Sequence, residues 1–148
     1  MSAPSRVYAL SRSAAAEWLA SIDTHGARRA LESDLDFVAD LHALEFPTTY
    51  ATAHGLVHDP DLLTFVVERD GTPIGYASGH VTTDGAGQLD YMAVAPDARG
   101  VGDGRVLLAA TLTALFAEED LDELRLTVEE YRQPAIQFYE KHGFTRVQ

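Results

Sequence analysis

A loop with three glycines at alternate positions is the part of this sequence best suited to chemistry: Arg99-Gly100-Val101-Gly102-Asp103-Gly104. It follows an apolar stretch at 89–94 and leads directly into a segment with helical periodicity. Glycine has no Cβ, so the backbone can turn sharply and bring its N–H groups close to a ligand. At the start of a helix those N–H groups have no intrahelical partner, and the helix dipole adds positive potential. The loop therefore predicts a binding site for an anion such as a diphosphate.

Two common phosphate motifs do not fit this loop. A P-loop has a lysine directly after its last glycine, where this chain has Arg105. The dinucleotide fingerprint has a further glycine three residues after Gly104, where this chain has Leu107. A glycine-rich turn that binds nothing is the alternative interpretation of the loop alone.

The elements on both sides of the loop predict an α+β protein with a mixed sheet. Alternating residues at 63–68, the turn Asp70-Gly71 and a return strand at 74–81 indicate a hairpin. A third strand is expected at 88–95, a helix from 102 or 103 to about 118, a strand at 122–128, a helix from Pro134 to Gly143 and a last strand at 144–147. Because a helical crossover joins the strands at 88–95 and 122–128, these two should run parallel.

The first part of the chain predicts short elements. A strand is expected at 6–10 and a helix, capped by Ser13, that continues to Ile22. A strand at 27–31 precedes a helix at 34–45, capped by Ser33 and closed by Pro47. A looser helical or irregular stretch then runs to about residue 58.

Together these segments resemble the GNAT superfamily of acyl-CoA N-acyltransferases. The family signature is Arg or Gln, two residues, Gly, one residue, then Gly or Ala at a strand-to-helix turn, and Arg99, Gly102 and Gly104 match it. A second block, 126–144, resembles the family's strand and helix near the C-terminus, and 27–47 resembles its first strand and helix. The resemblance covers residue 27 to the end, which divides the chain into an N-terminal extension, 1–26, and a GNAT-like domain, 27–148.

The resemblance implies a single α+β domain whose mixed, mostly antiparallel sheet splays between the strands at 88–95 and 122–128, with helices on both faces. It implies acetyl-CoA as cosubstrate, with the pantetheine arm along the first of these strands and the diphosphate on the glycine loop. A backbone N–H near Val94 would stabilise the oxyanion. The implied cofactor-binding residues are Met92, Ala93, Val94, Arg99, Gly100, Val101, Gly102, Asp103, Gly104 and Arg105.

The same resemblance implies direct attack by a primary amine through a tetrahedral intermediate. An amine with a pKa near 10.4 is only about one part in 10³ neutral at pH 7, so a base or a water relay helps. Asp90, where relatives often have an acidic residue, is the first candidate base, and Glu45 is the second. For both, a solvated carboxylate is the alternative.

Tyr139 aligns with the tyrosine that, in many relatives, faces the sulfur and protonates the leaving thiolate. A proton transfer from a phenol of pKa about 10 to a thiolate of about 8.5 is uphill by roughly 2 kcal/mol. Tyr139 is therefore expected chiefly to orient the sulfur. A core aromatic on an amphipathic helix is the alternative.

The chain departs from the family pattern in three places. Arg132 replaces an asparagine that contacts the cofactor arm, and we expect it to reach a cofactor phosphate. Asp103 replaces an aliphatic residue and would repel a diphosphate unless it points away or caps the helix. The family usually has two strands after Gly143-Phe144, and we expect residues 6–10 to supply the missing one, either within the chain or from the partner in a homodimer. An open sheet edge is the alternative.

Composition narrows the class of partner. A chain of 148 residues, 46% hydrophobic and 23% charged, fits one globular domain. The absence of cysteine excludes disulfides and thiolate metal ligands, and with no apolar run near the roughly 18 residues of a membrane span we expect a cytoplasmic protein. The net charge of −12 argues against nucleic acid as partner. No metal site is predicted, because His54 and His58 lack the other residues of a metalloprotease motif.

The sequence therefore predicts an N-acetyltransferase that moves an acetyl group from acetyl-CoA to a small-molecule or peptide amine. The alternative is a non-catalytic acyl-CoA-binding or regulatory domain, which the departures at Asp103 and Arg132 and the short C-terminus would suit.

Overall fold

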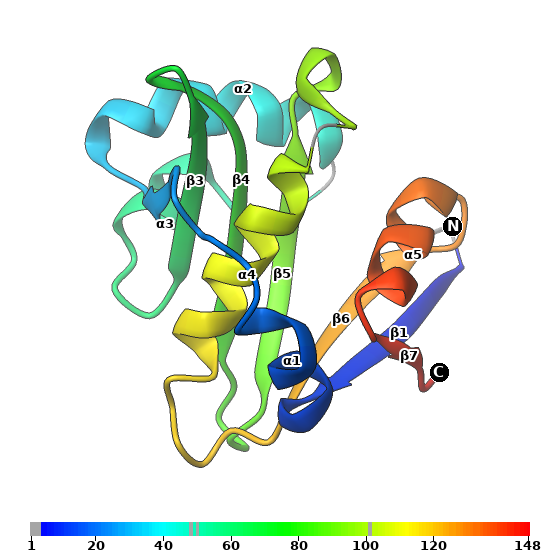
Figure 1. Ribbon diagram of the computed structural model, residues 1–148. Helices are drawn as coiled ribbons and strands as arrows, with labels where there is room; N and C mark the ends of the chain where they lie inside the picture. The colour runs from blue at the N-terminus through cyan, green and yellow to red at the C-terminus, as the bar shows by residue number, and fades with distance from the viewer. Residues whose placement is uncertain (1–3, 48, 50, 101) are drawn as a thin grey trace.

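The computed structural model describes residues 4–47, 49, 51–100 and 102–148. Within them, seven strands form one mixed sheet in the order β2-β3-β4-β5-β6-β1-β7 (Figure 1). The strands are β1 (Ser5–Ser11), β2 (Ala27–Arg29), β3 (Leu63–Arg69), β4 (Thr72–Val81), β5 (Gly87–Val94), β6 (Glu123–Glu129) and β7 (Thr145–Arg146). The α-helices are α1 (Arg12–Leu19), α2 (Leu35–Glu45), α3 (Ala53–His58), α4 (Asp103–Leu115) and α5 (Gln133–Lys141), with 3-10 turns η1 (Glu32–Asp34) and η2 (Pro96–Ala98). The predicted α+β class with a mixed, mostly antiparallel sheet is confirmed.

The β3–β4 hairpin forms at the predicted turn. Asp70 and Gly71 both have positive φ, 53° and 78°, as a two-residue hairpin turn of the I′ type requires. Asp70 is the one non-glycine residue with positive φ among the described residues, which fits the tolerance of aspartate for the left-handed region.

The sheet is splayed between β5 and β6, as expected. Their parallel pairing covers only Gly87–Leu89 against Leu124–Leu126. Beyond these pairs the two strands diverge, so that β5 stays with β4 while β6 stays with β1 (Figure 1). The divergence leaves one edge of each strand open for a ligand.

Strand β1 fills the place of the missing strand, from within the same chain. It pairs antiparallel with β6 along its whole length, from Ser5 opposite Glu129 to Ser11 opposite Glu123, and with β7 on its other edge. Tyr8 and Leu10 on this strand are fully buried. The expectation that residues 6–10 supply a strand is confirmed, and no partner chain is required for it.

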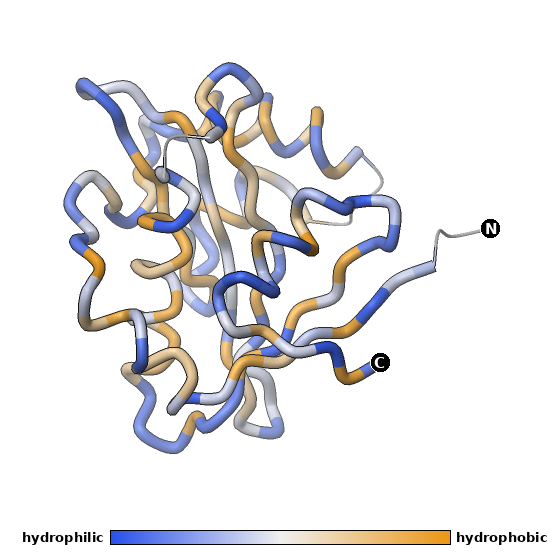
Figure 2. The backbone as a smooth tube through the Cα atoms, turned by 45° about the vertical axis from the view of Figure 1, so that its right-hand side comes forward, coloured by the Kyte–Doolittle hydropathy of each residue, from blue (hydrophilic) through white to orange (hydrophobic). Residues whose placement is uncertain are grey.

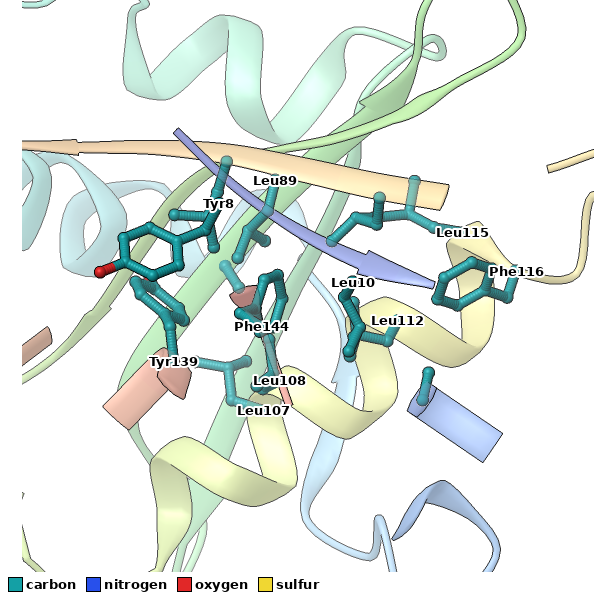
Figure 3. Packing of buried hydrophobic residues seen from close by; sticks show 14 of the residues in the cluster. Tyr8, Leu10, Leu89, Leu107, Leu108, Leu112, Leu115, Phe116, Tyr139 and Phe144 are labelled. Carbon is teal, nitrogen blue, oxygen red and sulfur yellow. The ribbon is translucent and has the colours of Figure 1, made fainter. Parts of the chain in front are cut away.

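Two apolar clusters cover the two faces of the sheet. The larger lies between the sheet and the helices α1, α4 and α5, with α4 contributing Leu107, Leu108, Leu112 and Leu115 (Figure 3). The smaller lies under α2 and α3 and includes Val38, Leu41, Leu56 and Tyr76. Hydrophobic segments run through the strands and α4, while the turns are hydrophilic (Figure 2). No helix in the described part of the chain is long and apolar enough to cross a membrane.

Two predicted helix caps are wrong. Ser11, not Ser13, caps α1, because its hydroxyl accepts a bond from Ala14 N at 3.1 Å, and the helix ends at Leu19 instead of Ile22. Ser33 lies inside η1, and the buried Asp34 beside it accepts from Leu31 N at 2.7 Å. The stretch expected to be loose before residue 58 contains α3, capped by Thr52.

Candidate functional site

The splay opens into two adjoining pockets that share one wall. We call them the loop pocket, about 830 Å³, which the glycine loop lines, and the sheet pocket, about 430 Å³, which the diverging parts of β5 and β6 line. Six residues line both: Phe46, Met92, Tyr131, Arg132, Ala135 and Tyr139. A ligand in one pocket can therefore meet a ligand in the other at this shared wall.

The loop pocket has the backbone of an anion site. Gly100 and Gly102 have φ of 90° and 91°, which other residues rarely adopt. The first bond of α4 runs from Val106 N to Gly102 O at 3.3 Å, so the amides of Asp103, Gly104 and Arg105 have no intrahelical acceptor. A Cβ on Gly104 would lie 3.5 Å from Met92 Cε and 3.6 Å from Phe138, and a longer side chain there would fill the pocket. Val101 lies outside the described residues.

Positive charge gathers around the loop pocket in an otherwise acidic chain. Its described lining includes Arg99, Arg105, Arg132 and Lys141, four of the chain's 11 lysines and arginines. Of the chain's 23 acidic residues, this described lining includes two, Glu45 and Asp103. A net charge of −12 makes this local excess of cations a specific feature, and it favours an anionic ligand.

His142 lines the same pocket as these cations but adds no charge to it. Its Nδ1–H donates to Phe138 O at 2.7 Å, and its ring packs against Phe138 and Trp18. Burial lowers the pKa of this imidazole, and Arg105 and Lys141 lower it further. The ring is therefore neutral at pH 7 and leaves the positive charge to Arg105 and Lys141.

Asp103 lines the loop pocket, and its charge has a partner. Its carboxylate pairs with Arg69, at the end of β3. The charge that was expected to repel a diphosphate is therefore matched by a guanidinium. Arg69 also lies 3.5 Å from Ala98 O, so this pair ties the loop to the β3–β4 hairpin.

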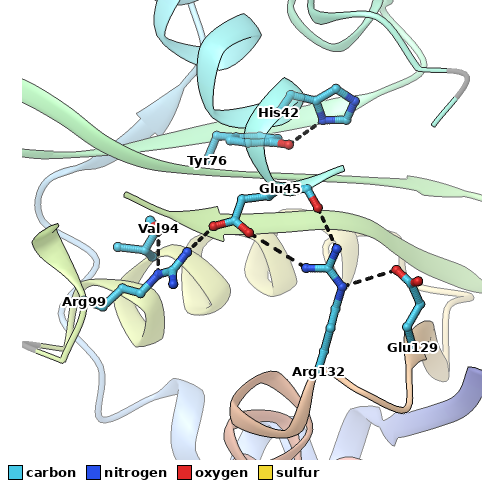
Figure 4. Close-up of polar contacts among 7 residues, drawn as sticks. All are labelled: His42, Glu45, Tyr76, Val94, Arg99, Glu129 and Arg132. Atoms are coloured by element: carbon cyan, nitrogen blue, oxygen red, sulfur yellow. Dashed lines mark hydrogen bonds and ion pairs between the residues drawn. The ribbon is translucent and has the colours of Figure 1, made fainter. Parts of the chain in front are cut away.

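An ion-pair network spans the open side of the splay (Figure 4). Glu45, at the end of α2, pairs with Arg99, whose Nε donates to Val94 O at 2.9 Å. Arg132, just before α5, donates to the backbone oxygen of Glu45 at 2.6 Å and lies 3.3 Å from Glu129. The network connects the β5 half of the sheet with the β6 half, so Glu45 holds two arginines in place.

The sheet pocket has a carboxylate at its β5 wall. Asp90 lines it, and its Oδ2 lies 2.6 Å from His80 Nδ1. Burial raises the pKa of Asp90, and the bond to His80 opposes this shift. Tyr91 lines the same pocket, bonded to Thr49.

Behind Tyr91, a buried histidine supports the wall. His42 Nε2–H donates to Ala51 O at 3.2 Å, so its Nδ1 accepts from Tyr76 OH at 2.5 Å (Figure 4). Burial lowers the pKa of His42 and raises that of Tyr76. Both side chains are therefore neutral, and their bond fixes the ring that packs edge-on against Tyr91 at 4.8 Å.

Tyr139 lies in the shared wall of the two pockets. Its ring packs against Phe138 and Phe144, and 9% of the residue is exposed. The hydroxyl is bonded to none of the described residues. Burial raises the pKa of Tyr139 to about 12, against a smaller opposing effect of Arg132.

The structure brings together nearly all of the residues singled out in the sequence. The loop pocket contains Glu45, Met92, Ala93, Val94, Arg99, Gly100, Gly102, Asp103, Gly104, Arg105, Arg132 and Tyr139, while Asp90 lies in the sheet pocket. Sequence reasoning missed Lys141 and His142, which share the helical face of Phe138. His80 could be read from the sequence as lining the acceptor cleft or, as we favoured, as an ordinary strand histidine, since nothing in a strand pattern distinguishes a histidine that bonds to an aspartate across a hairpin.

The comparisons with known proteins agree with this geometry. A mycothiol acetyltransferase of Thermomonospora curvata is 40% identical over 82 residues, which are 55% of this chain and 27% of that protein, so the chain spans about a quarter of this relative. An N-alpha-acetyltransferase of Sulfurisphaera tokodaii is 28% identical over 133 residues, 81% of this chain and 80% of that protein. The structure of Arabidopsis thaliana NAA60 in complex with acetyl-CoA has a TM-score of 0.71 at 17% identity and covers 82% of this chain and 85% of that one. The profile of the acetyltransferase (GNAT) family matches residues 23–144, and the chain therefore belongs to that family.

Proposed function

We propose that this protein is an N-acetyltransferase that binds acetyl-CoA in the loop pocket and a primary amine in the sheet pocket. The observation that carries the proposal is the meeting of the two pockets at Tyr139. A site for an anionic cosubstrate and a site with a carboxylate for a cationic acceptor thereby adjoin. Relatives named as acetyltransferases of mycothiol and of N-alpha amines support the reaction class.

The residues of the loop pocket fit acetyl-CoA. The amides of Asp103, Gly104 and Arg105 have no acceptor within α4 and, with Arg99 beside them, suit a diphosphate. Arg105 and Lys141, at the same pocket, suit a further phosphate. When bound, acetyl-CoA supplies an acetyl group activated as a thioester.

The open edge of β5 supplies hydrogen-bonding groups to the pocket. Ala95 N–H donates to Ile74 O of β4 at 2.8 Å, whereas Val94 O accepts from Arg99 on the other side. Since successive residues of a strand direct their backbone groups to opposite edges, the Val94 amide faces the splay. In this proposal the Val94 amide donates to the acyl oxygen as negative charge develops there.

Asp90 and Tyr139 have complementary tasks in this proposal. Asp90 accepts the proton that the amine nitrogen loses as it forms its bond to the acyl carbon. Tyr139 donates a hydrogen bond to the sulfur as the carbon–sulfur bond breaks. Glu45 holds Arg99 and Arg132, and we now propose a positioning role for it in place of the role of a base. Arg132, in contact with Glu45 and Glu129, joins the two halves of the splay.

The acceptor is a small-molecule or peptide amine, and the cytoplasm remains the expected compartment. A homodimer also stays a prediction, although β1 no longer requires one. The negative charge of Asp103 was one argument for a non-catalytic domain. This argument is weaker now, because Asp103 pairs with Arg69.

Two measurements test the proposal together. Isothermal titration calorimetry with acetyl-CoA should show micromolar binding, and thiol release should accelerate with some members of a panel of amino acids, N-terminal peptides, polyamines and aminosugars. Binding without thiol release across the whole panel would favour a non-catalytic domain, and no binding at millimolar acetyl-CoA would overturn the proposal.

A further inference from the structure

Asp90 has an unusual position in the β4–β5 ladder. Ser78 pairs with Tyr91 and Gly79 pairs with Leu89, so Asp90 is the extra residue of a β-bulge. Gly79 is required opposite this bulge, because a Cβ there would lie 2.7 Å from Gln88 O and 3.0 Å from Leu115 Cδ1. A bulge changes the direction of a side chain next to a site, and here that side chain is a carboxylate that lines the sheet pocket.

His80, on β4, reaches the same carboxylate from behind. Its Nδ1 lies 2.6 Å from Asp90 Oδ2. The described residues that line the two pockets do not include His80, so the imidazole touches the carboxylate without facing the acceptor. The side chains of His80 and Asp90 are both partly buried, with 34% and 25% exposed.

We propose that His80 is a positioning residue for the acetyl transfer, one that holds the Asp90 carboxylate in the orientation that receives the amine. The proposal rests on the proposed function and adds to it a residue that no motif marks. The second carboxylate oxygen, Oδ1, remains available to the amine while Oδ2 is held by the imidazole. A carboxylate fixed in this way loses less rotational freedom when it binds the acceptor.

The bond to His80 also affects when Asp90 is charged. Burial raises the pKa of Asp90 and the His80 bond lowers it, so removal of His80 should raise it further. The carboxylate would then ionise only at higher pH. The other titratable or charged groups that line the sheet pocket with Asp90 are Tyr91, Tyr131 and Tyr139, Glu129 on β6 and Arg132 before α5.

The test compares two substitutions at His80 in the full-length protein with an accepted amine. His80→Leu removes the donor, whereas His80→Asn retains an N–H near the position of Nδ1. His80→Leu should lower kcat about tenfold with an unchanged KM for acetyl-CoA, and the acidic limb of kcat/KM for the amine should move to higher pH. His80→Asn should recover most of the rate. His25→Leu, which removes an exposed imidazole with no contact to Asp90, is the control and should behave as wild type.

A double-mutant cycle with Asp90→Asn completes the test. If His80 acts through Asp90, the double variant His80→Leu/Asp90→Asn should be no slower than Asp90→Asn alone. Additive losses, or a His80→Leu enzyme with the kcat and pH profile of the wild type, would overturn the inference while leaving the proposed function intact. A wild-type protein that transfers acetyl groups to no amine would instead overturn the proposed function, and with it the role of His80.

Discussion

Tyr139 lies where the two pockets meet, and Tyr139→Phe tests whether its hydroxyl gives a proton or only a hydrogen bond to the leaving sulfur. Burial raises the pKa of Tyr139 to about 12, and an ordinary thiol has a pKa of about 8.5. Full transfer of the tyrosine proton to a thiolate would therefore be uphill by about 5 kcal/mol, at about 1.4 kcal/mol per pKa unit. Donation of a hydrogen bond to the sulfur avoids this cost, so we expect Tyr139 to stabilise the leaving thiolate without losing its proton.

The magnitude follows from the energy of one bond to a charged acceptor. Such a bond contributes about 1.5–3 kcal/mol, so Tyr139→Phe should lower kcat by about 10- to 150-fold. The substitution removes a hydroxyl that is bonded to none of the described residues, so the free energy of unfolding and the Kd for acetyl-CoA should change little. Because Tyr139 keeps its proton below about pH 11, its titration should not lower kcat at the alkaline end of a pH profile between pH 6 and 10.

The assay is steady-state thiol release across this pH range, with calorimetry for acetyl-CoA affinity. Tyr131→Phe is a suitable control, since Tyr131 lines the same pockets but is 63% exposed. Removal of the Tyr131 hydroxyl should leave kcat unchanged. An unchanged kcat in Tyr139→Phe would refute the reasoning. So would an alkaline limb near pH 8 or 9 that Tyr139→Phe abolishes, because the tyrosine would then titrate far below the value that its burial predicts.

Three further substitutions test the parts that support the site. Arg12→Ala removes the bonds of one guanidinium to the carbonyls that end α4 and the loop after it, at 2.6–3.0 Å, and should lower the free energy of unfolding in urea by about 2–3 kcal/mol. Arg12→Lys should lower it by less, and a loss under 0.5 kcal/mol in Arg12→Ala would contradict a stabilising role for these bonds. Asp34→Asn should lower it by about 3 kcal/mol at pH 7, because Asp34 is buried against Arg28 at 2.7 Å. The pKa of Asp34 is lowered chiefly by Arg28, so the contribution of this ion pair to stability is present above about pH 4 and is lost as pH falls through the pKa of Asp34 in the folded protein. In that pH range the free energy of unfolding of the wild type should fall faster than that of Asp34→Asn, and equal slopes would contradict a stabilising role for the Asp34–Arg28 pair. Asp103→Asn, which leaves Arg69 free to attract an anion, should lower the Kd for acetyl-CoA about threefold at low salt, whereas weaker binding would mean that the ion pair shapes the loop.

Local signals in the sequence predicted local structure well. The Asp70-Gly71 turn, the glycine loop and the crossover from β5 to β6 each depend on residues close together in the chain, and each is where the sequence placed it. The predicted cap of α1, Ser13, was wrong because the start of this helix depends on a contact with a distant segment. Arg12 N donates to Asp122 O at 2.8 Å, a contact between distant segments, and α1 begins at Arg12, so that its cap, Ser11, lies two residues before Ser13.

The candidate site was predictable in its backbone and less so in its side-chain partners. The pair of Glu45 and Arg99 joins residues 54 positions apart, so no spacing rule reveals it, and it changes the role that we assign to Glu45. The contact of His80 with Asp90 was hidden for a different reason. The bulge shifts the register by one residue, and counting outward from the turn without it places Asp90 opposite Ser78.

The N-terminal strand and helix contact the part of the chain that carries Tyr139, although no motif marks them. Helix α5 carries Tyr139 and has only nine residues, which is too short to be stable in water without tertiary contacts. The hydroxyl of Tyr8, on β1, donates to Glu140 at 2.8 Å, and Trp18 Nε1–H, on α1, donates to His142 O at 2.9 Å. These bonds, with the pairing of β1 between β6 and β7, hold the helix against the splay. The position of the hydroxyl at the meeting point of the two pockets therefore depends on β1 and α1, residues 5–19.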